Sequence, residues 1–309
     1  MATNQSSAAS NLVYEKTGAR IEVADSNDPV EREYQRVLAL DDAAQTEVER
    51  WLADDEKLGA AGAGIQGATL RARIQQRFEP VEKEYKDFLV RYPQHVKGRI
   101  AFGSFLGEIG REDEAADQYL KAREIDPKNT AAWNNLANYY GHNGPVTNAF
   151  ACYQKAIELN PKEPIYFQNF ATTVYLFRWD ATNYFGITEQ QVFDKAMDLY
   201  RKALALDPEN FPLATDLAQT YYGIQPPRVK DAFAAWNTAL KLARDDADRD
   251  GVRIHLARWH RTAGDFEAVR RELGPVTNAV FKVAKERILK SLDTASARTN
   301  AVPTTAVQK

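Results

Sequence analysis

The sequence predicts an all-α protein, an α-solenoid of about five antiparallel helix pairs with a helical N-terminal extension. Two observations lead to this fold class. An Asp-Pro or Asn-Pro dipeptide follows an aliphatic segment at Pro127, Pro161 and Pro208. Aromatic and small residues also recur at the same offsets in consecutive units of 34 residues. Such a period is typical of a repeated helix pair that buries its apolar face only by stacking on its neighbours.

Composition excludes several classes of protein. The chain has 309 residues, 44% of them hydrophobic, which is ordinary for a soluble globular protein. Its 40 basic and 43 acidic residues lack the basic excess of most nucleic-acid-binding proteins, so we expect no nucleic-acid partner. The single cysteine, Cys152, excludes an intramolecular disulfide. No segment approaches the roughly 20 apolar residues that span a bilayer, so we expect no direct membrane insertion.

The N-terminal part divides into two segments. Residues 1–27 are polar and lack the apolar core of a secretory signal, so they are expected to form a flexible terminus. The compartment is cytoplasmic by default, or extracytoplasmic if an export signal was trimmed. Residues 28–95 are predicted to be a helical region with a divergent repeat, because PVEREY at Pro29–Tyr34 echoes PVEKEY at Pro80–Tyr85. Each proline is expected at a helix start. The Gly/Ala-rich segment Gly59–Gly67 interrupts this region.

The clearest repeats are 96–129 and 130–163. Small residues such as Gly103 are expected to let the two helices of a pair approach closely. Large aromatic residues then fill the space between neighbours, namely Tyr119 in the first repeat and Trp133, Tyr140 and Tyr153 in the second. The prolines end the second helix of each pair, because proline cannot continue a helix.

These residues resemble the tetratricopeptide-repeat family, whose signature is W-x2-L-G-x2-Y followed by A-x3-F, A and P. Residues 130–163 match nearly every position, and residues 96–129 lack only the tryptophan, where Arg99 stands. The resemblance implies a right-handed superhelix in which the first helix of each pair lines a concave surface. It also implies a role in binding other proteins.

The pattern continues in weaker form towards the C-terminus. The repeat at 164–210 is 13 residues too long, and the repeat at 211–246 is nearly regular. Residues 247–292 combine a weak repeat with a final amphipathic helix, whose apolar residues include Val280, Val283, Ile288 and Leu289. This helix is expected to cap the open end of the stack. Residues 293–309 are small and polar and are expected to be a flexible tail.

Amide and hydroxyl side chains mark a candidate peptide-binding groove on the first helices. An amide offers both a donor and an acceptor, so a row of amides can pair with the main chain of an extended peptide. Asn135 and Asn169 resemble two rungs of the asparagine ladder in O-linked N-acetylglucosamine transferases; the alternative, that exposed helices simply carry amides, stays open. The lysine/arginine clamp of chaperone-tail adaptors is not reproduced, because Ile100 and Ser104 accompany Lys97. The groove residues are Asn134, Asn135, Asn138, Gln168, Asn169, Thr172, Thr215 and Gln219.

The insertion in the repeat at 164–210 is rich in aromatic residues. It either contacts a partner or folds back onto the stack, and folding back is favoured because so many aromatics rarely stay exposed. Thr188 and Gln191 form a capping box that restarts the helix. The candidate loop residues are Phe177, Trp179, Tyr184 and Phe185.

Catalytic and metal-binding motifs are largely absent, so we expect no enzyme activity, no cofactor and no metal. The weak calcium candidate is DADRDG, with Asp246, Asp248 and Asp250. Its later ligand positions hold Ile254 and Ala257, which cannot bind calcium. An acidic turn that caps the next helix is the simpler interpretation.

The sequence therefore predicts a non-enzymatic protein–protein interaction scaffold. It would bind a protein or peptide partner through the concave groove, as part of a larger assembly. The alternative is a structural protein that self-assembles into homo-oligomers through the ends of its solenoid.

Overall fold

A computed structural model describes residues 28–60 and 67–300 of the chain, with side chains described to residue 292. Every extended regular element in these residues is a helix, as the sequence predicts, and none of them forms a strand. The chain forms two compact units, residues 1–187 (the first unit) and 188–309 (the second unit). The division falls inside the repeat predicted for 164–210, directly after its insertion.

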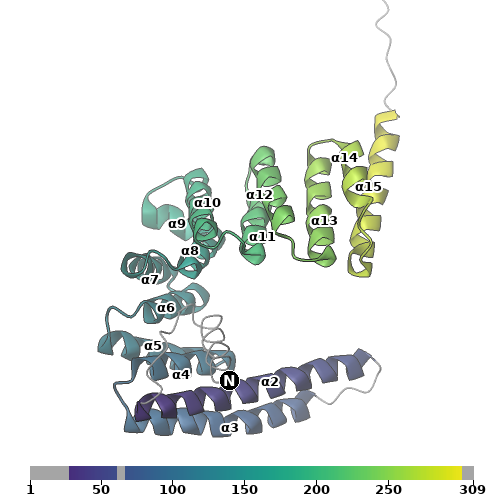
Figure 1. The fold of residues 1–309 in the computed structure, drawn as a ribbon. Coiled ribbons are helices and arrows are strands. Elements are labelled where there is room, and N and C mark those ends of the chain that lie inside the picture. The colour runs from purple at the N-terminus through teal and green to yellow at the C-terminus, as the bar shows by residue number, and fades with distance from the viewer. Residues whose placement is uncertain (1–27, 61–66, 301–309) are drawn as a thin grey trace, which may run out of the picture. The chain divides into compact units, whose positions relative to one another are not determined.

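The first unit contains a long helical hairpin followed by shorter helix pairs (Figure 1). The hairpin of α2 and α3 corresponds to the predicted N-terminal extension, while α4–α5 and α6–α7 form the two clearest repeats. These helices are α2 (Pro29–Ala60), α3 (Gly67–Arg91), α4 (Val96–Glu108), α5 (Glu112–Ile125), α6 (Thr130–Asn143), α7 (Val146–Leu159), α8 (Pro164–Leu176) and α9 (Arg178–Phe185).

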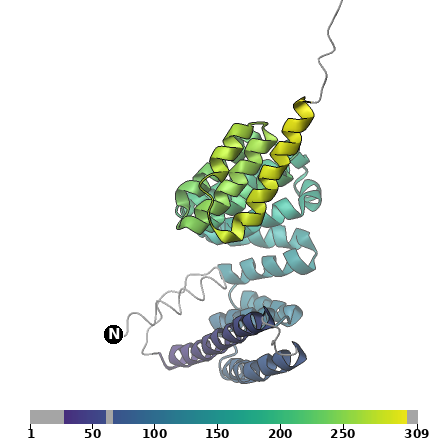
Figure 2. The same ribbon diagram turned by 90° about the vertical axis from the view of Figure 1, so that its right-hand side faces the viewer.

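The second unit continues the same alternation and ends in a longer helix. In Figure 2, the yellow α15 lies alongside the helices that precede it. The elements are α10 (Glu189–Leu206), α11 (Phe211–Thr220), η1 (Tyr221–Gly223), α12 (Val229–Leu242), α13 (Asp246–Thr262), α14 (Phe266–Leu273), η2 (Ala279–Phe281) and α15 (Lys282–Asn300).

Caps and prolines set the helix boundaries. The side chain of Asn129 accepts a hydrogen bond from the backbone N–H of Ala132 at 3.0 Å, which begins α6. Asn210 does the same for α11, and the capping box of Thr188 and Gln191 at the start of α10 is present as predicted. Such caps satisfy backbone donors that the first turn of a helix leaves without partners.

Close helix packing follows the predicted small residues. A Cβ atom built on Gly103 would lie 2.5 Å from Cε1 of Tyr119, so only glycine admits the tyrosine ring at that position. Tyr119 and Tyr153 are buried, whereas Trp133 and Tyr140 are only half-buried. Tyr119 and Tyr153 of the second helices therefore lie in the interior, whereas Trp133 and Tyr140 of α6 lie partly at its edge.

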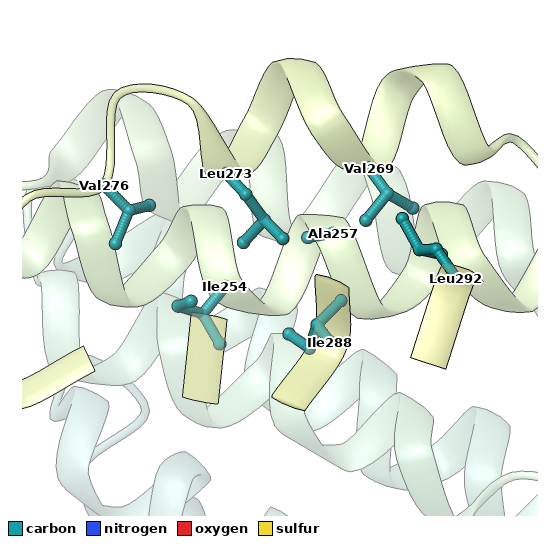
Figure 3. Close-up of a cluster of buried hydrophobic side chains, with 7 residues drawn as sticks. All are labelled: Ile254, Ala257, Val269, Leu273, Val276, Ile288 and Leu292. Carbon is teal, nitrogen blue, oxygen red and sulfur yellow. The ribbon is translucent and has the colours of Figure 1, made fainter. Parts of the chain in front are cut away.

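The C-terminal end is closed by a small apolar core. Figure 3 shows side chains from α13, α14 and α15 pointing toward one another, so α15 packs over α13 and α14. Val280 and Val283, expected among the apolar residues of this helix, do not face the core, because they are 81% and 64% exposed. Their neighbours Phe281 and Ala284 pack against it. The buried members are Ile254, Ala257, Val269, Leu273, Val276, Ile288 and Leu292.

Two boundaries differ from the prediction. Pro80 does not begin a helix but lies inside α3, whose buried residues Leu70 and Phe78 precede it and hold the earlier turns in place. The helix α15 continues to Asn300, into the segment expected to be a flexible tail. The segments predicted to be flexible at 1–27 and 301–309, and most of the Gly/Ala-rich interruption, lie outside the described residues.

Candidate functional site

The predicted amide row lies partly inside the protein. Asn134 and Asn135 are buried, at 1% and 5% exposure, between α6 and its neighbours. Nδ2 of Asn169 donates to Oδ1 of Asn134 at 3.2 Å, and Nδ2 of Asn134 donates to Oδ1 of Asn135 at 3.3 Å. These three amides therefore form a chain that links α8 to α6, and only Asn169 reaches the surface.

A small pocket of about 250 Å³ opens beside this chain in the first unit. It brings together three of the predicted groove residues, Asn138, Asn169 and Thr172. Gln168 is half-buried and does not line it, while Thr215 and Gln219 belong to α11 of the second unit. The complete lining is Asn138, Gly141, His142, Tyr153, Asn169, Thr172, Thr173, Leu176 and Phe177.

A buried phenol orients the amide of Asn138. Oη of Tyr153 donates to Oδ1 of Asn138 at 2.6 Å, and Oγ1 of Thr173 donates to Oη of Tyr153 at 3.4 Å. Burial raises the pKa of Tyr153, so the phenol stays protonated and remains a donor. With its oxygen engaged, Asn138 presents Nδ2 as a hydrogen-bond donor.

The neighbouring amide presents the opposite group. Nδ2 of Asn169 is engaged with Asn134, which leaves Oδ1 of Asn169 as an acceptor. Among the described residues, neither Nδ2 of Asn138 nor Oδ1 of Asn169 has a partner. The pocket thus offers one donor and one acceptor, the complement of a peptide group.

Apolar residues border the same pocket. Leu176 is 59% exposed at the C-terminal end of α8, and Phe177 follows it. Sequence reasoning missed Leu176 and His142, although they stand 34 residues apart and so occupy the same position in consecutive repeats. The 34-residue period of the sequence could have identified both residues.

The aromatic insertion is a helix, α9, and not an open loop. Phe185 and Tyr184 pack against Phe150 of α7, with ring centroids 5.5 and 5.3 Å apart. Trp179 remains 65% exposed, and the guanidinium of Arg178 lies 5.9 Å from the centre of its ring. Within the insertion, Trp179 is therefore the aromatic residue most available to a partner.

The candidate calcium residues lie in the first turns of α13. Asp248 forms an ion pair with Arg244 at 2.8 Å, and Asp246 pairs with Arg249 at 2.7 Å. Asp250 is buried and accepts backbone hydrogen bonds from residues 277 and 278, each at 2.9 Å. The three carboxylates therefore have different partners and do not converge on one point.

The described part of the chain contains no group of three histidine, cysteine, aspartate or glutamate side chains that could hold a metal ion. Burial raises the pKa of the Cys152 thiol to about 11, so the thiolate is scarce at neutral pH. Neither finding identifies a catalytic group among the described residues.

His255 belongs to an aromatic stack in the second unit. Its ring lies 4.1 Å from Trp236 at an interplanar angle of 6°, and Oη of Tyr222 lies 3.0 Å from its Nδ1. Burial, with a smaller effect of Arg258, lowers the pKa of His255 to about 4. The imidazole is therefore neutral at pH 7, with Nδ1 within hydrogen-bond distance of the Tyr222 hydroxyl.

This lowered pKa predicts acid sensitivity of the second unit. The unfolded chain binds a proton at His255 near pH 6.5, whereas the folded chain does so only near pH 4. Stability is thus full above pH 6.5 and falls as the pH drops towards 4, by up to about 3 kcal/mol from this group. Urea unfolding at pH 7 and pH 5 measures the loss. We expect His255→Phe, which keeps a ring on Trp236, to show a smaller loss, and an equal loss in both proteins would contradict the assignment.

Comparison with known proteins shows that this chain is similar to repeat proteins. The family described as Tetratricopeptide repeat matches residues 130–163. Tetratricopeptide repeat protein 6 of Homo sapiens is 29% identical over 168 residues, which make up 43% of this chain and 30% of that protein. Photosystem I assembly protein Ycf3 of Rippkaea orientalis is 24% identical over 148 residues, 46% of this chain and 80% of that protein. The chain thus spans less than a third of the human relative and most of the cyanobacterial one.

A solved structure shares the fold. PilW, described as a widely conserved type IV pilus biogenesis factor, has a TM-score of 0.53 at 15% identity, covering 71% of this chain and 94% of that one. No α-helix within residues 28–60 or 67–300 has both the length and the apolar character that crossing a membrane requires.

Proposed function

Because this chain belongs to the tetratricopeptide-repeat proteins, which mediate protein–protein interaction and assembly, we propose that it is a non-enzymatic scaffold. It binds an extended peptide segment of a partner across α6 and α8, within a larger assembly. The binding site is the pocket between Asn138 and Asn169. Ycf3, an assembly protein by its name, is a parallel for such a role.

The paired amide groups are the observation that supports this proposal most. Nδ2 of Asn138 is available to a peptide carbonyl, and Oδ1 of Asn169 is available to a peptide N–H. Main-chain pairing of this kind requires an extended segment, because the backbone groups of a helix are already bonded to one another. The amide pair therefore favours an extended peptide over a helical one at this pocket.

The residues that line the pocket also indicate which side chains a bound peptide would carry. The lining contains one imidazole, that of His142, and no lysine, arginine, aspartate or glutamate. Leu176 and Phe177 supply apolar surface at one edge, with the exposed Trp179 two residues further along the chain. We therefore expect an apolar anchor residue next to the paired main chain, in place of a charged terminus.

The experiment starts from peptides selected from a displayed random library against the immobilised full chain. Fluorescence anisotropy with a selected peptide then gives its dissociation constant for variants. We expect Leu176→Asp to weaken binding at least about tenfold, because a charge would occupy the apolar edge. Leu206→Asp is the matched control, since Leu206 is 40% exposed on α10 and lies outside the pocket.

Two results would contradict this proposal. One is equal affinity of the Leu176→Asp and Leu206→Asp proteins for every selected peptide. The other is retention of binding by Asn138→Asp, which replaces the donor with a carboxylate that repels a peptide carbonyl. Asn135→Ala is a poor probe, because Asn135 is buried and its loss would disturb the packing of α6.

A second function, self-assembly through the end of the solenoid, is favoured by one observation. Val280 and Val283 are the most exposed valines of the C-terminal cap and lie one helical turn apart. Light scattering over a concentration series tests this function. A monomer at every concentration would exclude it, and a dimer that Val283→Asp dissociates would support it.

A further inference from the structure

The helices α2 and α3 are much longer than the repeat helices that follow them. They contain 32 and 25 residues, whereas α4 contains 13. Figure 1 shows the hairpin extending past the end of α4, so within residues 28–60 and 67–300 no third helix packs against its outer half. A groove of about 700 Å³ lies at this point, between α2, α3 and the turn that follows α4.

The floor of this groove is apolar. Val48 and Leu52 stand one turn apart on α2, and Ile74 and Phe78 stand one turn apart on α3. Phe78 packs edge-on against Phe105 of α4, with centroids 5.6 Å apart, which fixes one end of the floor. Val48 and Phe78 are 6% and 9% exposed, whereas Leu52 is 47% exposed and Ile74 is half-buried, so the floor is accessible from solvent at Leu52 and Ile74. Two apolar ridges at i, i+4 spacing are the surface on which a third helix packs.

The rim of the groove is acidic. Four glutamates line it against two arginines, Arg71 and Arg111. Arg111 is already engaged by Glu82 and by Glu114, so it contributes little free positive charge. The lining glutamates are Glu49, Glu79, Glu82 and Glu108.

Two of these carboxylates have no cationic partner of their own. In the part of the chain that the structure describes, neither Glu49 nor Glu79 forms an ion pair. They belong to opposite walls of the groove, α2 and α3. A basic side chain on either flank of an inserted helix would therefore meet a carboxylate.

We propose that this groove binds a basic amphipathic helix of a partner protein, with its apolar stripe on the floor and lysine or arginine on both flanks. The lining of α3 runs from Arg71 to Glu82, which corresponds to about 16 Å or three helical turns. Charge complementarity identifies this occupant: the chain's own residues 1–27 carry three acidic and only two basic side chains. The groove shares no lining residue with the pocket at Asn138, so the two proposals fail independently.

The test uses the full chain and a synthetic amphipathic peptide of leucine and lysine, about four turns long, labelled for fluorescence anisotropy. A peptide with glutamate in place of lysine is the charge control. We expect the lysine peptide to bind at least about tenfold more tightly than the glutamate peptide, with an affinity that falls as salt is added.

Matched variants locate the binding. Leu52→Asp places a charge on the floor, and Leu58→Asp is its control, since Leu58 is 46% exposed on the same helix but lies outside the groove. The double change Glu49→Lys with Glu79→Lys reverses the rim, and Glu84→Lys with Glu124→Lys changes the net charge equally elsewhere. We expect at least about tenfold weaker binding for each groove variant and little change for each control.

Three outcomes would overturn the proposal. The first is no binding of the lysine peptide, and the second is equal affinity of groove and control variants. The third is binding that becomes at least tenfold tighter when Leu12→Asp and Val13→Asp are introduced, which would identify the N-terminal segment of the same chain as the occupant. Light scattering on the same samples tests whether the groove instead binds a second copy of the chain. Dimers that dissociate when the peptide is added would assign the groove to self-association.

Discussion

Replacing Phe150 with alanine is expected to lower the free energy of unfolding of the first unit by about 3–5 kcal/mol. Phe150 is fully buried on α7, and its ring lies 5.3–6.2 Å from the rings of Phe170, Tyr184 and Phe185. The change removes contacts that hold α9 against the repeat and leaves a cavity that the surrounding helices fill only in part. Urea unfolding followed by circular dichroism measures the loss.

The control for this prediction is the exposed tryptophan of the same insertion. Trp179 is 65% exposed, so Trp179→Ala should change the stability by less than about 1 kcal/mol. Hydrogen exchange should also show faster opening of α9 in the Phe150→Ala protein than in the Trp179→Ala protein. Equal losses in both would mean that the insertion does not pack through Tyr184 and Phe185.

Asp250→Ala is expected to cost about 3 kcal/mol, the second largest effect. The carboxylate accepts two backbone hydrogen bonds, from Thr277 and Asn278, and thereby ties α13 to the segment that leads into α15. Without it, two backbone N–H groups lose their partner beside a buried position. Urea unfolding and the hydrogen exchange of α15 give the measurement.

Two variants separate this role from a general effect of charge. Asp250→Asn keeps an oxygen acceptor and should lose less stability than Asp250→Ala. Asp246→Ala removes a carboxylate with 92% of its side chain exposed, and should change the stability by less than about 0.5 kcal/mol. Because the three aspartates have separate partners, added calcium should leave the melting temperature of the native chain unchanged. A rise in that temperature with calcium would contradict this interpretation.

Whether the sequence predicts which residues line the pocket depends on how each helix is rotated about its axis. Repeat alignment placed Asn138, Asn169 and Thr172 in the groove, and in the structure all three line one pocket. It also placed Asn134 and Asn135 in the groove, yet both are buried. Neighbouring helical positions differ by about 100° around the axis, so a small rotation decides whether an amide faces solvent or the next helix. That rotation depends on how closely α6 and α8 approach.

The groove of the α2–α3 hairpin could not be predicted from the sequence, for a different reason. The apolar residues Val48, Leu52, Ile74 and Phe78 fit an ordinary buried helix face, and a pattern does not say whether a neighbour covers that face. Among the described residues nothing covers it, because α4 is less than half as long as α2. Relative helix lengths across a turn decide this exposure, and local periodicity does not encode them.

The sequence alone determined the helix pairs and their order, because proline, capping side chains and the 34-residue spacing of small and aromatic residues act within a few turns of one another. Tertiary structure decided which amides reach the pocket, that Tyr184 and Phe185 contact Phe150 while Trp179 stays exposed, and that the N-terminal hairpin leaves a groove with an apolar floor and an acidic rim. The physical reason is that burial is set by the distance and rotation between helices far apart in sequence. Those quantities depend on the sum of many small packing contacts rather than on any single motif.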